Sequence, residues 1–365
     1  MSITVGRCTA DGTRRYRERF PSLAPDHFNS AGDCWLSSVG LGTYARMADP
    51  ALTEQLSAAI QFLVMRGCNV IDTAPNYADG SAERAVGQGL ALLYSGGLIG
   101  REEMFVATKV GIVPSSVIEP LVAGHIDGLG PVEVLNDGLC FDPRYLRWQV
   151  EGSRQRLGLE TLDCLFLHNL DVLALILGRV KCLQMFAHAV ETLEKLVLQG
   201  WIDAYGVSAW HGFRRVESAA DYLSLADLCS IVHSIAGADG HFRFVQAPIG
   251  LWAPEAVLLP NQITVKAKAP VSLLRAAHDL GLAVIANSSL LQGELVGTPG
   301  LEENYGVSGL TGPMQAIQFS RSIPGVTSVL VGMKDPAHLE QNASLFALPK
   351  ADLRHFESPD RTYPQ

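Results

Sequence analysis

The chain has 365 residues, of which 48% are hydrophobic and 18% charged, a composition that suits a protein with a large core in water. Its formal net charge of −9, with no long run of Lys or Arg, argues against a nucleic-acid or anionic-membrane partner. No apolar run reaches the ~18 residues needed to span a bilayer. The N-terminus also lacks a signal-peptide pattern, so we expect a cytoplasmic protein.

Seven cysteines are scattered along the chain without CxxC spacing. An odd number at irregular intervals is typical of reduced intracellular thiols that fill a core. It does not suggest a disulfide framework or a zinc site. We therefore expect no metal centre.

The first 34 residues are interpreted as an N-terminal extension built on a β-hairpin. Two strand-like runs, at 3–9 and 13–20, flank the dipeptide Asp11-Gly12. Asp-Gly between two such runs is a good signal for a two-residue hairpin turn. The alternative is a frayed, charged tail.

From residue 35 onward, short apolar strands alternate with segments in which apolar residues recur at helical spacing. A glycine-rich and proline-rich stretch, 111–142, has little periodicity and is predicted to be a long loop. A further helical region begins at Phe213 and breaks near Ser224. The strands are expected at 38–41, 69–71, 104–108, 162–167, 202–207, 242–246, 282–286 and 326–331, and the other helices at 52–64, 83–93, 143–157, 183–198, 271–280, 313–321 and 336–346.

Eight strand–helix units predict an α/β fold, a (β/α)8 TIM barrel that spans residues 1–365 as one domain. We see no change in composition that would mark a domain linker. The rival fold is an open doubly wound sheet, but its GxGxxG fingerprint is missing from the sequence, and Gly40-Leu41-Gly42 is only a bare GxG. In a barrel, the 111–142 loop would lie over the active-site face.

Four polar residues stand at or just beyond the ends of predicted strands: Asp72, Tyr77, Lys109 and His168. Each has a structural interpretation when taken alone, such as a cap or a surface lysine. The carboxyl ends of parallel barrel strands meet on one face, where catalysis occurs. An acid, a phenol, an ammonium and an imidazole gathered there predict a proton-transfer site.

The residues around these positions resemble the aldo-keto reductase family. The resemblance covers roughly residues 36–346, in the same order along the chain. It implies a (β/α)8 barrel with an N-terminal hairpin closing its bottom and NADPH-dependent reduction of an aldehyde or ketone. The motifs that carry it are Asp72-Thr73-Ala74-Pro75-Asn76-Tyr77, Gly80-Ser81-Ala82-Glu83-Arg84-Ala85-Val86-Gly87, Val106-Ala107-Thr108-Lys109, Leu165-Phe166-Leu167-His168-Asn169 and Tyr205-Gly206-Val207-Ser208.

The resemblance gives each catalytic candidate a role. Tyr77 would be the general acid that protonates the developing alkoxide. Because a phenol has a pKa near ~10, we expect the Lys109 ammonium, held by Asp72, to lower the pKa of Tyr77. His168 would donate to, or position, the carbonyl oxygen.

The resemblance also implies an NADPH site. Ala209 stands where the family usually has Asn, and Asn287 stands where an aromatic residue often stacks on the nicotinamide. Lys334 precedes a predicted helix N-terminus at Asp335 and would bind the 2′-phosphate. The implied cofactor residues are Ser208 and Gln246, then Ser288, Leu290, Gln292 and Gly293, then Gly332, Lys334, His338, Gln341 and Asn342.

Four aromatic residues that follow strand ends, Tyr44, Trp210, Phe213 and Trp252, are candidates for the wall of a substrate pocket. Core packing is an alternative for Trp252. Two other functions stay open: a lyase that forms a Schiff base on Lys109, and a nicotinamide-binding regulatory subunit with vestigial catalysis. The small-molecule substrate and the oligomeric state are not identified.

Overall fold

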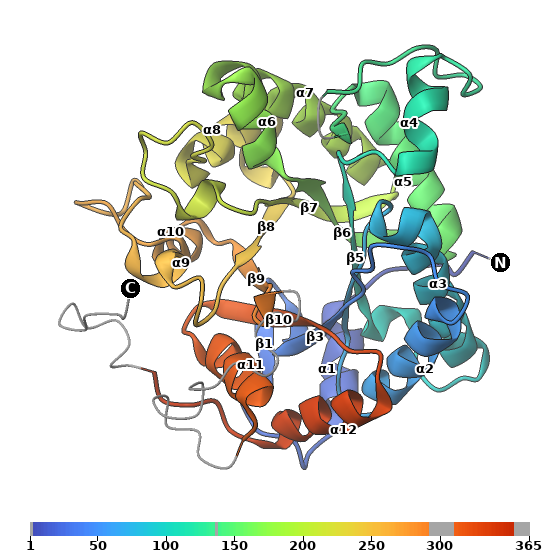
Figure 1. Ribbon diagram of the computed structural model, residues 1–365. Coiled ribbons are helices and arrows are strands. Elements are labelled where there is room, and N and C mark those ends of the chain that lie inside the picture. The colour runs from blue at the N-terminus through green and yellow to red at the C-terminus, as the bar shows by residue number, and fades with distance from the viewer. Residues whose placement is uncertain (1–2, 136–137, 292–309, 354–365) are drawn as a thin grey trace.

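The computed structural model describes residues 3–135, 138–291 and 310–353, and its centre is a closed barrel of eight parallel strands (Figure 1). The strands are hydrogen-bonded in the order β10-β3-β4-β5-β6-β7-β8-β9, and every pairing is parallel. The prediction of a (β/α)8 barrel is confirmed. Its strands are β3 (Val39–Gly42), β4 (Val70–Asp72), β5 (Phe105–Val110), β6 (Leu162–His168), β7 (Ile202–Ser208), β8 (Phe242–Pro248), β9 (Ala283–Asn287) and β10 (Val326–Gly332).

A helix follows each strand and packs its apolar face on the outside of the barrel. These helices are α2 (Leu52–Val64), α3 (Ser81–Ser95), α5 (Pro143–Leu157), α7 (Arg179–Leu198), α8 (Leu225–Ala236), α10 (Leu273–Leu280), α11 (Gly312–Ser322) and α12 (Pro336–Ser344). Two shorter helices, α6 (Leu170–Leu177) and α9 (Glu255–Leu258), lie in the connections that precede α7 and α10. None of the helices in the described part of the chain is both long enough and apolar enough to cross a bilayer.

The N-terminal hairpin is present, but it is not where the sequence placed it. The strands β1 (Phe28–Ala31) and β2 (Cys34–Ser37) pair antiparallel, with Ala31 opposite Cys34. Their two-residue loop is Gly32-Asp33, and Gly32 has a φ of 57°. Leu36 of β2 is fully buried with apolar residues of the barrel interior, so the hairpin closes that end of the barrel.

The predicted Asp11-Gly12 turn is wrong, because these residues lie in the first turn of helix α1 (Ala10–Glu18). Thr9 caps this helix by accepting a hydrogen bond from the Gly12 amide at 3.0 Å. A Cβ on Gly12 would lie 2.2 Å from the carbonyl oxygen of Glu102, so this glycine serves a close approach and not a turn.

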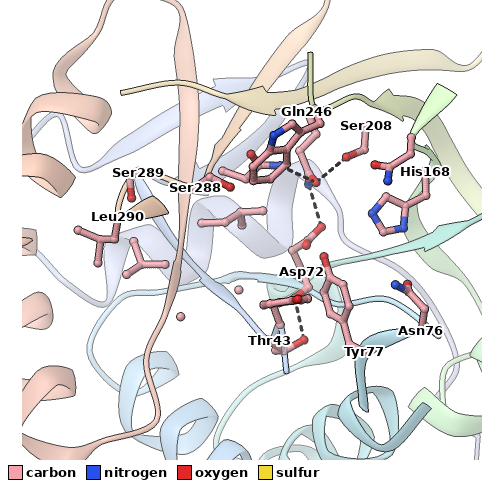
Figure 2. A pocket seen from close by; sticks show the side chains of 18 of the residues that line it. Thr43, Asp72, Asn76, Tyr77, His168, Ser208, Gln246, Ser288, Ser289 and Leu290 are labelled. Carbon is pink, nitrogen blue, oxygen red and sulfur yellow. Dashed lines mark hydrogen bonds between the residues drawn. The ribbon is translucent and has the colours of Figure 1, made fainter. Parts of the chain in front are cut away.

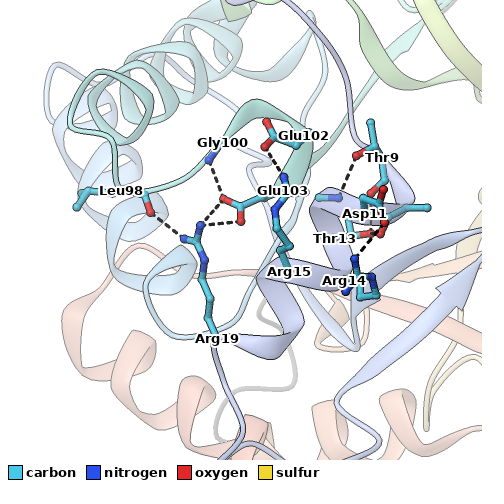
Figure 3. A network of polar contacts seen from close by, with 12 residues as sticks. Thr9, Asp11, Thr13, Arg14, Arg15, Arg19, Leu98, Gly100, Glu102 and Glu103 are labelled. Carbon is cyan, nitrogen blue, oxygen red and sulfur yellow. Dashed lines mark hydrogen bonds and ion pairs between the residues drawn. The ribbon is translucent and has the colours of Figure 1, made fainter.

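Ion pairs fasten α1 to the segment that leads into β5 (Figure 3). Arg15 contacts Glu102 at 2.6 Å, and Arg19 contacts Glu103 at 2.7 Å. The carboxylate of Glu103 is almost fully buried and also accepts the Gly100 amide at 2.7 Å. Because this segment precedes a strand, α1 lies at the end of the barrel opposite the predicted site.

The 111–142 segment is not wholly a loop, since it contains the helix α4 (Ser115–Val122), with Pro120 inside it. Pro120 and the flanking glycines interrupt the helical pattern of the sequence, and for this reason a loop was predicted. The segment follows β5, and the Ser116 amide donates to the Asp79 carboxylate at 3.2 Å. It therefore borders the end of the barrel that carries Tyr77.

Gly206 in β7 allows the backbone of β8 and the ring of Phe166 to approach it closely inside the barrel. A Cβ at this position would lie 2.2 Å from the Phe244 carbonyl oxygen and 3.0 Å from the Phe166 ring. We predict that Gly206→Ala lowers the free energy of unfolding by about 1–3 kcal/mol through overpacking. Urea denaturation measures this. Gly42→Ala is the matched control, because its Cβ would meet no atom closer than 3.6 Å, and a change within about 0.5 kcal/mol is expected there. Equal losses in both variants would contradict the packing argument.

Candidate active site

The site is the polar end of the barrel interior. Successive residues of a strand point to opposite sides, so alternate residues face the barrel axis. In β5 the inward residues are Phe105, Ala107 and Lys109, and the first two belong to the apolar interior cluster. The same alternation ends in polar residues at the same end of β4, β6, β7, β8 and β9, whereas β3 and β10 end in Gly42 and Gly332. The polar residues are Asp72, Lys109, His168, Ser208, Gln246 and Asn287.

Asp72 and Lys109 form an ion pair inside the barrel, on the neighbouring strands β4 and β5. Their exposed fractions are 4% and 1%. The Lys109 ammonium also donates to the Thr73 carbonyl at 3.0 Å. Burial alone would lower the pKa of Lys109, but Asp72 and Tyr77 raise it above its ordinary value. Lys109 is therefore held as a cation.

Tyr77 lies above this pair, with the Lys109 nitrogen 4.9 Å from its ring centroid. The two residues after it, Ala78 and Asp79, have φ values of 46° and 54°, which are rare for residues other than glycine. Such strained backbone persists only where its surroundings enforce it, and here the Ala78 amide donates to the Ala45 carbonyl at 2.8 Å. This turn fixes the ring over the ion pair.

The expected lowering of the pKa of Tyr77 is not found. Burial raises the pKa of Tyr77 above its ordinary value, and the Lys109 ammonium, which lowers it, does not fully offset that effect. The sequence could reveal the neighbouring cation but not the extent of burial. The phenol is thus protonated at neutral pH, as a proton donor must be.

His168 faces Tyr77, with ring centroids 6.3 Å apart and an interplanar angle of 78°. Burial, and secondarily the Lys109 cation, hold the pKa of His168 well below its ordinary value. Its Nδ1 atom is buried without a hydrogen-bond partner in the described structure. A neutral imidazole beside a phenol can donate one N–H to an oxygen between them.

Gln246 ties the ion pair to the rest of the site (Figure 2). Its side-chain amide donates to the second oxygen of Asp72 at 2.9 Å. Its carbonyl oxygen accepts hydrogen bonds from Ser208 at 3.0 Å and from Asn287 at 3.3 Å. Both oxygens of Asp72 are therefore occupied, one by an ammonium and one by an amide.

A cavity of 570 Å³, the main cavity, opens over these residues. The lining includes Asp72, Tyr77 and His168, and Lys109 lies beneath it. The predicted cofactor residues in its wall are Ser208, Gln246, Ser288, Leu290, Gly332, His338, Gln341 and Asn342. Gln292 and Gly293, also expected to hold the cofactor, lie outside the described residues.

Lys334 lies in an adjoining cavity of 660 Å³, which shares Gly332 and His338 with the first. Its wall also includes Glu54 and Asp335. The Asp335 carboxylate accepts the amides of Ala337 at 2.9 Å and His338 at 3.2 Å. The N-terminus of α12 is thus capped by its own chain, and a phosphate there would meet this carboxylate.

Two of the four aromatic wall candidates, Tyr44 and Trp210, line the main cavity. The structure does not bring the other two into its lining. Phe213 is 1% exposed and packs in the main core, and Trp252 is 52% exposed. Strand-end position alone could not distinguish these outcomes, since the loops turn the side chains in different directions.

Several lining residues were missed by the sequence analysis, among them Thr43, Asn76, Ile112 and Asn169. Asn169 follows His168 directly and has a φ of 56°, a conformation that Asn tolerates better than most residues. An Asn beside each of Tyr77 and His168 was the signal available. Among the described residues, no group of three or more His, Cys, Asp or Glu could hold a metal ion.

Comparison with known proteins adds family information to this geometry. Residues 38–308 match the model of the Aldo/keto reductase family. Two curated relatives from Escherichia coli are 30% identical: methylglyoxal reductase YeaE over 178 residues and an NADH-specific methylglyoxal reductase over 181. These matches cover 49% and 48% of this chain and 47% and 49% of the relatives, so the chain spans about half the length of each.

Solved structures share the fold. An aldo/keto reductase from Klebsiella pneumoniae in complex with NADP and acetate is 22% identical, with a TM-score of 0.58 over 94% of this chain and 98% of that one. The holo form of AKR11C1 from Bacillus halodurans is 16% identical, with a TM-score of 0.61 over 94% and 99%. At such identities the likeness shows the barrel alone. The family model covers most of the sequence, however, and the chain belongs to the aldo/keto reductase family.

Proposed function

We propose that this protein reduces a small aldehyde or ketone to an alcohol with a nicotinamide dinucleotide, preferably NADPH. One observation carries the proposal: a half-buried phenol and a neutral imidazole face each other above a buried Lys109–Asp72 ion pair, at the floor of a cavity. Carbonyl reduction needs one proton donor and one group that positions the oxygen. Tyr77 and His168 supply that pair.

In this mechanism Tyr77 gives its proton to the oxygen of the carbonyl as charge develops there. The Lys109 cation stabilises the phenolate that remains, and Asp72 holds Lys109 in place. His168 donates its N–H to the same oxygen, as an oxyanion-hole donor does. The dinucleotide, when bound, supplies the hydride to the carbonyl carbon.

The residues present fit a nicotinamide dinucleotide. The Oδ1 atom of Asn287 and the Oγ atom of Ser289 are buried near the cavity without hydrogen-bond partners, and such atoms are costly unless a ligand or water satisfies them. Ser208 and Gln246 would hold the nicotinamide end, and Lys334, His338 and Asn342 the adenosine end. The cavity volume is within the usual range for small-molecule sites.

The relatives' names suggest a substrate class. Both are called methylglyoxal reductases, and a small dicarbonyl would fit a cavity that presents the amides of Asn76 and Asn169 beside His168. We therefore favour small, polar aldehydes over long apolar ones.

The two alternatives fit less well. A Schiff base requires a neutral amine, yet the pKa of Lys109 is raised and its ammonium is bound to Asp72 and Thr73. A vestigial regulatory subunit would have no need to keep Asp72, Tyr77, Lys109 and His168 together. Failure of borohydride to trap substrate on Lys109 would argue further against the lyase.

Tyr77→Phe should lower the rate of carbonyl reduction by about 10²–10⁴-fold while dinucleotide affinity changes little, because the phenol donates the proton but does not anchor the cofactor. Steady-state kinetics and fluorescence titration with NADPH measure the two effects. Tyr44→Phe removes the other phenol that lines the cavity and should lose far less activity. Near-normal kcat in Tyr77→Phe would show that another group is the acid.

His168→Gln should reduce the pH dependence of stability. The folded pKa of His168 is lowered, so below about pH 6.5 only the unfolded chain takes up this proton, and the wild type loses stability as the pH falls. Between pH 7.5 and pH 5.0 the contribution is up to about 2 kcal/mol. Urea unfolding at both values should show a smaller difference for His168→Gln than for wild type or for the exposed-site control His188→Gln. Identical differences in all three would mean that His168 is protonated in the folded protein.

Lys334→Ala should weaken NADPH binding roughly tenfold to hundredfold and NADH binding little, since one charge-assisted contact to the 2′-phosphate is worth about 1.5–3 kcal/mol. Asp335→Asn removes the negative charge that caps α12 and should strengthen NADPH binding. Titration of all three proteins with both cofactors tests this. Parallel losses for NADPH and NADH in Lys334→Ala would show that Lys334 does not read the 2′-phosphate.

A further inference from the structure

The loop that follows β7 carries Trp210 into the wall of the main cavity. Two charged side chains that do not line the cavity form hydrogen bonds with the backbone of this loop. One is Asp171, at the start of α6, and the other is Arg214, within the loop. Neither has a part in the proton transfer proposed above.

Asp171 accepts two backbone amides of the loop with one carboxylate oxygen. The His211 amide lies at 2.6 Å and the Gly212 amide at 3.1 Å. Asp171 is 1% exposed, and its other oxygen has no hydrogen-bond partner in the described structure. A buried carboxylate is tolerated here because it lies in the first turn of a helix, where backbone amides favour negative charge.

Arg214 holds the loop from the opposite side of the chain. Its guanidinium donates to the Trp210 carbonyl through two nitrogens, at 3.0 Å and 3.3 Å. The third nitrogen pairs with Glu255 of α9 at 2.6 Å. Only 9% of the Arg214 side chain is exposed. Its hydrogen bonds to Trp210 and Glu255 are therefore partly shielded from water and stronger than those of an exposed ion pair.

The loop also has little room to move. A Cβ on Gly212 would lie 2.7 Å from the Leu223 side chain and 2.8 Å from that of Asp171. Beyond it, the Asn261 amide donates to the carbonyls of Phe213 at 2.8 Å and Arg215 at 2.7 Å. The backbone on both sides of Trp210 is thus fixed, which limits how far its indole can shift from the cavity wall.

We propose that Trp210 determines substrate size, and that Asp171 and Arg214 are positioning residues that hold it in place. The inference rests on the proposed carbonyl reduction. The 570 Å³ cavity must hold the nicotinamide as well as the substrate, so a fixed indole limits the width left for the carbonyl compound. A loosened or truncated wall admits a bulkier one.

The test compares kcat/KM for 2-naphthaldehyde with kcat/KM for propanal. Trp210→Ala should raise this ratio at least about tenfold, the scale on which pocket shape discriminates substrates. Arg214→Gln and Asp171→Leu should raise it in the same direction, while Asp171→Asn, which keeps an acceptor oxygen, should stay near wild type. Arg215→Gln is the matched control, because Arg215 pairs with Asp221 at 3.5 Å on the same loop and makes no hydrogen bond with Trp210 in the described structure.

A double-mutant comparison separates positioning from general damage. In the Trp210→Ala background, Arg214→Gln should no longer change the ratio, because the wall on which it acts is gone. A ratio that falls or does not change in the single variants, or one that changes equally in Arg215→Gln, overturns the proposal. So does a full Arg214→Gln effect without Trp210.

A readout without catalysis keeps this inference apart from the proposed function. The difference in tryptophan emission between a protein and its Trp210→Phe variant is the emission of Trp210. Acrylamide quenching of this component reports how accessible the Trp210 indole is to solvent. Quenching of this component should increase in Arg214→Gln and Asp171→Leu but not in Arg215→Gln, whether or not either aldehyde is reduced. Unchanged quenching in both overturns the positioning role even if the enzyme is active. Loss of all reduction in wild type with the expected quenching would overturn the proposed function alone.

Discussion

The alternation of inward and outward residues in a closed parallel barrel is the constraint on which the site depends. Towards the bottom, the inward positions are filled by Phe105, Phe166, Phe244 and smaller apolar residues, with Leu36 of the hairpin beneath them. Towards the top, the same positions become polar. His168, Ser208 and Gln246 are register partners across three adjacent strands. Hydrogen-bond register thus places these three side chains side by side, whereas Tyr77 is positioned by the strained turn after β4.

That placement buries the Lys109–Asp72 pair. The burial affects the hydrogen bonds and pKa values of the residues around the pair. Removing two charges from water is unfavourable unless their remaining bonding capacity is used. Here the ammonium is shared with Thr73 and the second carboxylate oxygen with Gln246. Lys109 therefore stays cationic, and its field lowers the pKa of His168 further than burial alone does. One buried cation thus favours a neutral imidazole and a stabilised phenolate at once.

The sequence predicted the elements whose signal is local. The strands that lead to Asp72, Lys109 and His168, and the helices after them, could be predicted from the spacing of apolar residues alone. The prediction of a turn at Asp11-Gly12 was wrong because Gly12 is needed for a different reason. The backbone of Glu102, far away in the sequence, packs against it and leaves no space for a Cβ. The degree of burial of Tyr77, and hence the direction of its pKa, is likewise a property of the assembled barrel. The same holds for Phe213 and Trp252, whose side chains turn to the core and to solvent. The Asp335 cap was foreseeable from Asp335-Pro336, but its competition with a phosphate needed the neighbouring cavity.

The family resemblance implies an aromatic residue where this chain has Asn287, and the hydrogen-bond network gives Asn287 a different role. The Asp72 carboxylate accepts hydrogen bonds only, so Gln246 must present its amide nitrogen there and its carbonyl oxygen to the other side. That oxygen then requires donors, which Ser208 and Asn287 provide. An aromatic ring at position 287 has no amide N–H to offer Gln246. In this chain the Asn287 amide nitrogen therefore fixes Gln246, and through it Asp72, while the one side-chain oxygen of Asn287, Oδ1, is left as a buried acceptor beside the cavity.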